Sequence, residues 1–278
     1  MLRVGLIQLN ASDNPSANLP VTEDLVRQAA ADGARLVLTP EMTNCISQSR
    51  AWQQDVLCRE AEDPTLARLR EVADALGIWL LIGSLGIRID AADGRFANRS
   101  YMIGPDGDIV ARYDKIHMFD VQVSPTETFR ESEAFRPGDR AVLAQTDFAA
   151  VGMTICYDLR FGALYRALAS AGAGILTVPA AFSPVTGAAH WEVLLRARAI
   201  ETGCFVLAPA QTGNHPVGRG RPRRTWGHSL AVAPWGEVLV DAGTEPGVSL
   251  ADLDLDQIAH ARRRIPSLSH GREFRGPE

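Results

Sequence analysis

The chain has 278 residues, of which 46% are hydrophobic and 22% are charged, and these values exclude an intrinsically disordered protein. The formal net charge of -5 disfavours general nucleic-acid binding, which requires a broad basic surface. No apolar run is long enough to cross a bilayer, so we expect no membrane partner.

Strand-like and helical patterns alternate through the first 90 residues. Residues 1–10 lack a small-residue cleavage site and are predicted to begin a buried strand, so we expect a cytoplasmic protein. The alternation is typical of an α/β protein. The predicted strands are residues 2–9, 35–40 and 78–87, and the predicted helices are residues 18–32 and 64–76.

The middle of the chain changes character. Residues 95–104 and 108–114 are strand-like and flank the turn residues Gly104-Pro105-Asp106-Gly107, which predicts an antiparallel hairpin. We therefore expect a mixed sheet. Residues 115–139 have no convincing period, and irregular segments of this length are usually functional.

The last part of the chain returns to the alternating pattern. The sequence has no internal repeat and no low-complexity linker, so we predict a single domain over residues 1–266. Residues 267–278 are predicted to form a polar tail that lies on the surface or on a partner. The predicted strands are residues 149–156, 174–179, 204–210, 225–233, 238–243 and 248–255, and the predicted helices are residues 161–171, 188–203 and a short basic segment after 255.

The four cysteines are not spaced as metal ligands. Cys45, Cys58, Cys156 and Cys204 form no C-x-x-C pair and have no histidine nearby at zinc-ligand spacing. We therefore predict no metal site, and in a cytoplasmic protein we expect reduced thiols.

Cys156 differs from the other cysteines in its place along the chain. It ends the apolar strand at 149–156 and is followed by a helical pattern, which predicts a strand-to-helix turn. Such a turn can project a nucleophile from the edge of a sheet and aim the next backbone N–H, that of Tyr157, at an oxyanion. The alternative is a small buried side chain, which is how most free cysteines behave.

One cation is chemically unusual in this sequence. Lys115 is the single lysine among the 28 lysine and arginine residues. An ammonium is a compact point charge that fits a small cavity, whereas the arginine guanidinium is a broad planar fork. The sequence thus predicts a position that requires an ammonium, although compositional drift would give the same count.

Glu41 follows the strand at 35–40, whose carboxyl end should lie at the same edge of the sheet as Cys156. A buried carboxylate there could act as a base, or it could be an ordinary charge at a helix start. Glu41, Lys115 and Cys156 together form a coherent cysteine hydrolase site. His117, His190 and His228 are better explained as hydrogen-bonding structural residues.

These motifs resemble the carbon–nitrogen hydrolase (nitrilase) superfamily along essentially the whole chain. The matching segments include LTPE ending at Glu41, YDKIHMFD around Lys115 and GMTICYDLRF around Cys156. The resemblance implies a four-layer αββα sandwich with two mixed β-sheets, a Glu-Lys-Cys catalytic set, no metal or organic cofactor, and a homodimer or higher homo-oligomer. Glu131, in FRES, matches a second glutamate placed next to the lysine.

Within the superfamily, the chain is similar to the nitrilase-like branch that contains deaminated glutathione amidase. This implies an amidase that attacks a small-molecule amide through a thioester. Omega-amidase and N-carbamoyl amino acid hydrolase remain alternatives, and an inactive binding scaffold is a more distant one. The segments 121–129 and 214–225 depart from the relatives and are expected to cover the pocket.

The substrate contacts are less certain from sequence. The resemblance suggests Phe182 and His190, and carboxylates on a substrate such as deaminated glutathione would need cationic partners. Arg160, just after the nucleophile, is one candidate, and the arginines of the run 219–224 are others. Glycine and proline break this run, which favours a loop over a nucleic-acid patch.

Overall fold

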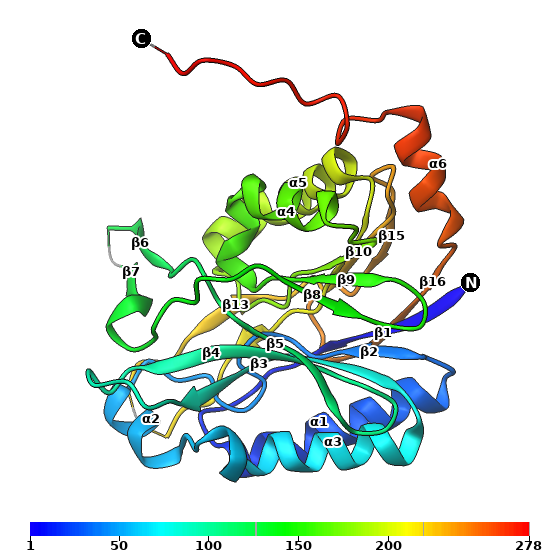
Figure 1. The fold of residues 1–278 in the computed structure, drawn as a ribbon. Helices are drawn as coiled ribbons and strands as arrows, with labels where there is room; N and C mark the ends of the chain where they lie inside the picture. Colours follow the sequence, from blue (N-terminus) through cyan, green and yellow to red (C-terminus); the bar gives the residue numbers. More distant parts are fainter. Residues whose placement is uncertain (126, 219, 278) are drawn as a thin grey trace.

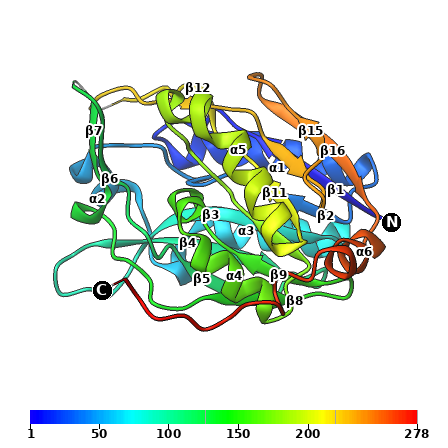
Figure 2. The same cartoon turned by 90° about the horizontal axis from the view of Figure 1, so that it is seen from above.

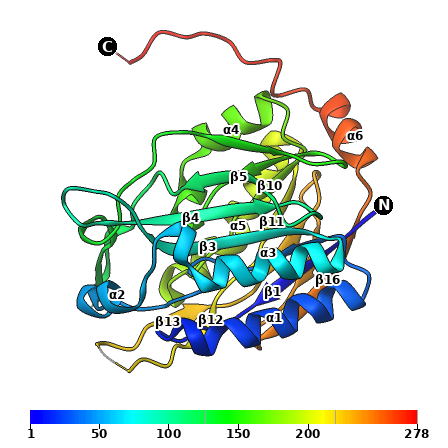
Figure 3. The ribbon, with the colours of Figure 1, turned by 60° about the horizontal axis from the view of Figure 1, so that its bottom comes forward.

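The computed structural model describes residues 1–125, 127–218 and 220–277. Figure 1 shows four layers: helices below, two sheets in the middle and helices above. This arrangement confirms the predicted αββα sandwich. The lower helices are α1 (Pro15–Ala31) and α3 (Pro64–Leu76), which lie side by side in Figure 3, and the upper ones are α4 (Gly162–Ser170) and α5 (Pro184–Thr202), which Figure 2 shows from above.

The first sheet has six strands in the order β16-β1-β2-β3-β4-β5. The pairs β1–β2 and β2–β3 are parallel and the other three are antiparallel, so the sheet is mixed as predicted. The strands are β1 (Leu2–Gln8), β2 (Leu36–Leu38), β3 (Trp79–Arg88), β4 (Phe96–Ile103), β5 (Ile109–Asp114) and β16 (Gly247–Leu253).

The second sheet also has six strands, in the order β15-β14-β11-β10-β9-β8. Read from β8, its pairs run antiparallel, parallel, parallel, antiparallel, antiparallel, the same sequence as in the first sheet read from β16. The two halves therefore share one plan. The strands are β8 (Val142–Gln145), β9 (Ala150–Met153), β10 (Ile175–Thr177), β11 (Phe205–Ala208), β14 (Leu230–Val232) and β15 (Val238–Asp241).

The main core lies between the two sheets. Leu38 and Met102 of the first sheet belong to one buried cluster with Met153 and Leu176 of the second, and all four are fully buried. Each such side chain contributes roughly 1.5–3 kcal/mol by leaving water. A second cluster fills the space between the first sheet and helices α1 and α3. The parallel strands are thus covered on both faces, and their exposed carboxyl ends remain available for a site.

Several helix ends differ from the prediction because of local capping. Helix α1 begins at Pro15, three residues earlier than expected, because the Asn14 side chain accepts a hydrogen bond from the Ser16 N–H. Helix α5 begins at Pro184 rather than at residue 188. It ends at Gly203, whose φ of +59° suits the left-handed cap that glycine adopts without strain.

The segment 115–139 contains more regular structure than its sequence indicated. It forms the hairpin β6 (Asp120–Ser124) and β7 (Glu127–Arg130), followed by the 3₁₀ turn η2 (Glu131–Glu133). The hairpin β12 (Thr212–Asn214) and β13 (Arg224–Trp226) was also not predicted. Two-stranded ribbons this short carry too few alternating residues to be recognised. Figure 2 shows β6 and β7 at the same end of the molecule as α2 (Arg50–Val56).

The chain closes with helix α6 (Asp256–Arg264), and residues 271–277 form neither helix nor strand and are exposed. The preceding residues are attached, since Ser267 Oγ donates to the Glu201 carbonyl at 3.0 Å. The division into one domain and a tail stays a prediction. Within the described ranges, no helix has the length and apolar character needed to span a bilayer.

Candidate active site

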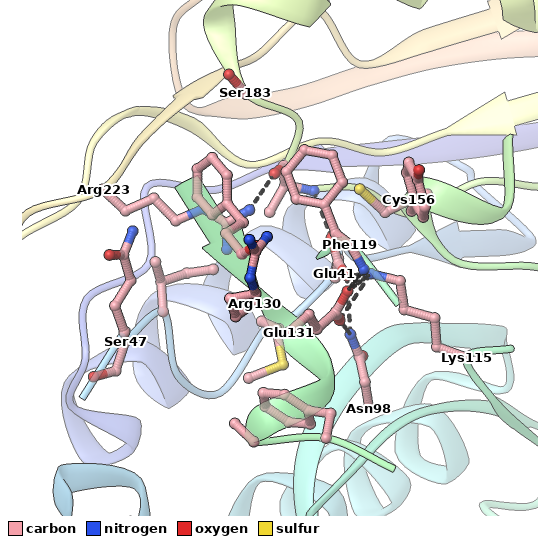
Figure 4. A pocket seen from close by; sticks show the side chains of 18 of the residues that line it. Glu41, Ser47, Asn98, Lys115, Phe119, Arg130, Glu131, Cys156, Ser183 and Arg223 are labelled. Carbon is pink, nitrogen blue, oxygen red and sulfur yellow. Dashed lines mark hydrogen bonds and ion pairs between the residues drawn. The ribbon is translucent and has the colours of Figure 1, made fainter. Parts of the chain in front are cut away.

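A cavity of about 350 Å³ opens where strands of both sheets end. Glu41, Lys115, Glu131 and Cys156 all line it, so the structure brings the predicted catalytic residues together from distant parts of the sequence (Figure 4). Glu41 follows β2, Lys115 follows β5 and Cys156 follows β9. The rest of the lining includes Met42, Ile46, Asn98, Phe119, Phe129, Arg130, Tyr157, Phe182, Ser183 and Arg223.

Lys115 is the centre of a buried charge cluster. Its side chain is 2% exposed, and Nζ lies 2.9 Å from Glu41 Oε1 and 2.8 Å from each carboxylate oxygen of Glu131. Burial lowers the pKa of Lys115, but the charges of Glu131 and Glu41 outweigh it and hold that pKa above its ordinary value. Lys115 is therefore an ammonium at neutral pH, and its contacts need a compact head group.

Glu41 connects the lysine to the rest of the pocket. Its Oε1 also accepts a hydrogen bond from Asn98 Nδ2 at 2.9 Å, and its Oε2 accepts one from the Ala181 N–H at 2.9 Å. Burial raises the pKa of Glu41, whereas Lys115 and Arg223 lower it, and the net pKa lies below its ordinary value of 4.5. Glu41 is thus ionised at neutral pH.

Cys156 occupies a strained turn. Strand β9 ends at Met153, and Cys156 begins the 3₁₀ helix η3 (Cys156–Arg160) with a φ of +47°. A residue with a Cβ in this left-handed region is uncommon, and such strain is concentrated at functional sites. The prediction of a strand-to-helix turn is therefore correct, although two residues separate the strand from the cysteine.

The thiol of Cys156 is neutral at rest. Burial raises its pKa well above the ordinary value, Glu41 raises it further, and Lys115 acts in the opposite direction. The interaction between the two groups lowers the pKa of Glu41 and raises that of Cys156. The carboxylate is therefore placed to accept the proton that the thiol must lose before it can act as a nucleophile.

Glu131 and Asn98 hold this cluster in place. Glu131 Oε2 accepts the Phe119 N–H at 2.7 Å in addition to its contacts with Lys115. Asn98 donates to Glu41 at 2.9 Å, and its carbonyl accepts the Lys115 N–H at 3.0 Å. Sequence analysis missed Asn98. Its only signal is an amide next to apolar residues at the start of β4, where it is 1% exposed.

Asp158 ties the lysine segment to the cysteine turn. It is fully buried and accepts hydrogen bonds from the Tyr113 hydroxyl at 2.6 Å, the His117 N–H at 3.0 Å and the Ile155 N–H at 2.9 Å. His117 Nδ1 lies 2.7 Å from the same carboxylate. His117 thus contacts a structural carboxylate, and no contact places it as the base for Cys156 in the described part of the site.

The predicted substrate contacts lie in two different environments. Phe182 lines the cavity, but Arg160 and His190 do not, among the residues that the structure describes. Both terminal nitrogens of Arg160 lie 3.3 Å from His190 Nδ1, and its guanidinium lies 5.6 Å from the centre of the Phe182 ring. The substrate contact predicted for Arg160 and His190 stays a prediction.

The basic run contributes one residue to the pocket. Arg223 lines the cavity, and its Nη2 donates to the Ala181 carbonyl at 2.6 Å. Arg219, at the start of the run, lies outside the described residues. Arg224 is exposed on β13 and does not line the cavity. Arg130 of β7 adds a second guanidinium, which Figure 4 shows between Arg223 and Glu131.

Within residues 1–125, 127–218 and 220–277, no three histidine, cysteine or acidic side chains are grouped so that they could hold a metal ion. The cavity does hold three reactive side chains, those of Glu41, Lys115 and Cys156. These are an ionised carboxylate in contact with an ammonium, and a neutral thiol that lines the same cavity. Such a set can activate a sulfur nucleophile and stabilise negative charge on a carbonyl oxygen.

Comparisons with known proteins agree with this chemistry. Residues 3–263 match the family model described as Carbon-nitrogen hydrolase. A deaminated glutathione amidase of Yersinia enterocolitica is 37% identical over 270 residues, covering 97% of this chain and 92% of the relative. Omega-amidase NIT2 of Homo sapiens is 36% identical over 264 residues, covering 95% of this chain and 92% of the relative.

Solved structures share the fold as well as the sequence. The NitFhit protein of C. elegans superposes with a TM-score of 0.89 at 32% identity, covering 98% of this chain and 65% of that chain. A variant of the amidase from Nesterenkonia sp. AN1, in which acrylamide has added to the active-site cysteine, gives a TM-score of 0.76 at 26% identity. The match covers 96% of this chain and 98% of that chain. The chain therefore belongs to the carbon–nitrogen hydrolase family of the nitrilase superfamily.

Proposed function

We propose that this protein is a cysteine-dependent amidase that cleaves a linear, non-peptide C–N bond through a thioester. The observation that carries the proposal is the position of Glu41, whose carboxylate contacts the Lys115 ammonium at 2.9 Å in the cavity that Cys156 also lines. The pKa directions support the same roles, since a neutral thiol next to an ionised carboxylate needs only one proton transfer to become a nucleophile.

The first half of the reaction forms the acyl-enzyme. Glu41 takes the proton of Cys156 as the sulfur attacks the amide carbonyl, and the resulting oxyanion is stabilised by Lys115 and the Tyr157 N–H. The C–N bond then breaks. Glu41 delivers its proton to the departing nitrogen, so an amine or ammonia leaves and a thioester remains on Cys156.

The second half releases the acid. Glu41, ionised again, accepts a proton from a water molecule that attacks the thioester, and the second oxyanion occupies the same site beside Lys115. Collapse expels the Cys156 sulfur, which regains its proton from Glu41. Glu131 keeps Lys115 in position through its two 2.8 Å contacts and so acts through the lysine, not on the substrate.

We favour deaminated glutathione as the substrate. Deaminated glutathione amidases are 37% identical to this chain over 97% of its length, and the cavity carries two arginines that suit an anionic amide. Omega-amidase activity is the alternative supported by the 36% identity to Omega-amidase NIT2. N-carbamoyl amino acid hydrolysis and an inactive scaffold remain the competing predictions, and each is an outcome of the experiments below.

We further propose that the enzyme is a homodimer or a higher homo-oligomer in the cytoplasm. Helix α5 exposes Val193 (67%) and Ile200 (53%), and Trp235, Val238 and Leu239 are each 40% exposed nearby along β14–β15. Apolar side chains gathered in this way are typical of a surface that pairs with a second subunit. Equilibrium sedimentation of the wild type and of Val193→Asp would test the assembly.

The decisive test is Cys156→Ala, with Cys58→Ala as the matched control because Cys58 lies outside the cavity lining. Without the nucleophile, no acyl-enzyme forms and turnover should fall by roughly 10⁵-fold or more, whereas the control should retain its activity. Mass spectrometry of the wild type quenched during turnover should show the acyl adduct on Cys156. Retained activity in Cys156→Ala would refute the mechanism.

A substrate panel distinguishes the competing activities. Deaminated glutathione, 2-oxoglutaramate and N-carbamoyl amino acids are compared by kcat/KM, and the proposal expects deaminated glutathione to be hydrolysed best. A protein that hydrolyses none of them, and whose Cys156 is not labelled preferentially by a thiol-reactive probe, would be an inactive scaffold.

A further inference from the structure

Arg223 places an unneutralised cation in the cavity wall. Among the residues that the structure describes, no carboxylate forms an ion pair with it, and its polar contact is the bond from Nη2 to the Ala181 carbonyl at 2.6 Å. Its Nε is buried and has no hydrogen-bond partner. An unsatisfied buried donor costs about 1–3 kcal/mol, so a ligand that accepts this bond would gain affinity from it.

Arg99 and Arg198 are paired with carboxylates, whereas Arg88 resembles Arg223 in having a buried Nε without a hydrogen-bond partner. Arg99 forms a two-pronged pair with Asp114 at 2.6 and 2.9 Å, and Arg198 lies 2.7 Å from Glu201. Arg223 instead rests against the ring of Phe129, with 5.6 Å between the guanidinium and the ring centre. Of Arg88 and Arg223, Arg223 is the one that lines the cavity, where a bound ligand can supply the missing partner.

The backbone of Ala181 fixes how far Arg223 lies from the reacting groups. Arg223 bonds to the Ala181 carbonyl, and the N–H of the same residue donates to Glu41 Oε2 at 2.9 Å. The covalent path from the N to the O of one residue is about 4 Å, so Arg223 Nη2 lies no more than ~10 Å from the Glu41 carboxylate. An acyl group whose carbonyl lies at the reacting groups therefore needs only a short chain, of about five carbons or fewer, to place its far end beside Arg223.

The surroundings of Arg223 favour an anion. Its charge opposes the effect of burial on the pKa of Glu41 and lowers that pKa, and it adds to burial in lowering the pKa of His215. The free N–H groups of the fork can bind both oxygens of a carboxylate at once. Phe129 and Phe182 supply apolar walls for the methylene groups between the carboxylate and the amide.

We propose that Arg223 is the anchor for a carboxylate at the far end of the substrate's acyl chain. The inference rests on the proposed amidase function and narrows it to amides of dicarboxylic acids, in which Cys156 attacks one end and Arg223 holds the other. Arg130 also lines the cavity, but it is exposed, so water screens its charge and it is not the anchor.

A matched pair of substrates tests the anchor. Glutaramate carries the carboxylate, and its methyl ester has a neutral group of similar size at the same position. Arg223→Gln should lower kcat/KM for glutaramate by roughly 10- to 100-fold, mainly through KM, and should change kcat/KM for the ester by no more than about threefold. Arg223→Lys should restore part of the loss, because it returns the charge without the fork.

Arg224→Gln is the control, since Arg224 is the next residue in the chain but is exposed outside the cavity. It should leave both substrates within about threefold of the wild type. An equal loss of both substrates in Arg223→Gln would overturn the proposal and assign Arg223 a structural role. A selective loss of glutaramate in Arg130→Gln, with none in Arg223→Gln, would also overturn it.

A binding measurement separates this proposal from the amidase function. Calorimetry of glutarate with the Cys156→Ala protein requires no turnover, and adding Arg223→Gln should weaken the affinity at least tenfold. Equal affinity in both proteins, or no binding to the Cys156→Ala protein, would refute the anchor. The amidase function fails by a different result, namely the absence of any acyl adduct on Cys156 with the neutral ester.

Discussion

Two charge clusters lie on neighbouring residues of β4 and β5, and they are built differently. Asn98 and Lys115 belong to the buried cluster of the active site, while Arg99 and Asp114, the adjacent residues, belong to an outer cluster with Glu60. Successive side chains of a strand point to opposite faces, so one pair of strands supplies both clusters. Their different environments explain the choice of cation in each.

The outer cluster uses arginine and remains in contact with water. Arg99 is 21% exposed, Asp114 29% and Glu60 26%, and Glu60 also lies 2.8 Å from Arg112. A planar guanidinium group can donate two parallel hydrogen bonds to one carboxylate. At the active site, Lys115 is 2% exposed and places one nitrogen against two carboxylates. The comparison teaches that lysine is retained where a point charge must fit a closed space.

Exchanging the cation of each cluster for the other type should give the largest difference in kcat between the two clusters. Lys115→Arg puts a broad fork into a space shaped for one nitrogen, so the oxyanion donor is misplaced and kcat should fall by roughly 10²- to 10³-fold. The matched change Arg99→Lys keeps the charge of the outer cluster and should leave kcat within about twofold. Steady-state kinetics on the preferred amide measures both.

One result would contradict the prediction for Lys115→Arg. If Lys115→Arg were as active as the wild type, the ammonium would have no special role, and the single lysine would reflect compositional drift. A thermal melt of both variants serves as the folding control, because a partly unfolded Lys115→Arg protein would lose activity without testing the head group.

The same comparison shows what the sequence could reveal. Lys115 was recognisable because it is unique, and Cys156 because an apolar strand ends just before it. Arg223 could not be separated from its neighbours, since an irregular run has no period to indicate which side chain faces inward. Glu131 and the four-layer stacking came from family resemblance, because packing between sheets leaves no local pattern.

Arg160 illustrates how a residue close to the nucleophile in sequence can lie outside the cavity lining. It is four residues after Cys156, but both lie on the 3₁₀ helix η3, which has about three residues per turn. Arg160 is therefore about a third of a turn away from the cysteine side and contacts His190 instead of lining the cavity. The turn's helical type was not visible in the sequence, whereas the position of the nucleophile was.

Removing one carboxylate from each cluster sharpens the comparison. Glu131→Gln loses a charge and one of the two bonds to Lys115, so the ammonium shifts and kcat should fall by about 10- to 100-fold with little change in KM. Glu60→Gln removes the corresponding carboxylate of the outer cluster and should leave kcat within about twofold. Equal effects of the two changes on kcat would contradict a positioning role for Glu131.

The pH dependence should distinguish a carboxylate base from a free thiolate. The pKa of Glu41 is lowered below 4.5 and that of Cys156 is raised, so the active pair is present above the Glu41 pKa and is lost as pH falls through it. We expect kcat/KM to vary by less than about twofold between pH 6 and 8. A tenfold rise per pH unit would instead indicate that the reactive species is a thiolate formed by titration.

The smallest expected effect concerns stability and its dependence on salt. Glu60→Gln removes contacts with Arg99 and Arg112 that water partly screens, so it should lower the free energy of unfolding by about 1 kcal/mol at low salt. At 1 M NaCl the Debye length is about 3 Å, and the loss should become smaller. The kcat defect of Lys115→Arg should not change with salt, because ions do not reach a side chain that is 2% exposed. Urea unfolding at 0.05 M and 1 M NaCl measures the free energy of unfolding of the wild type and of Glu60→Gln. An equal loss at both salt concentrations would mean that the outer cluster stabilises the fold by packing and not by charge.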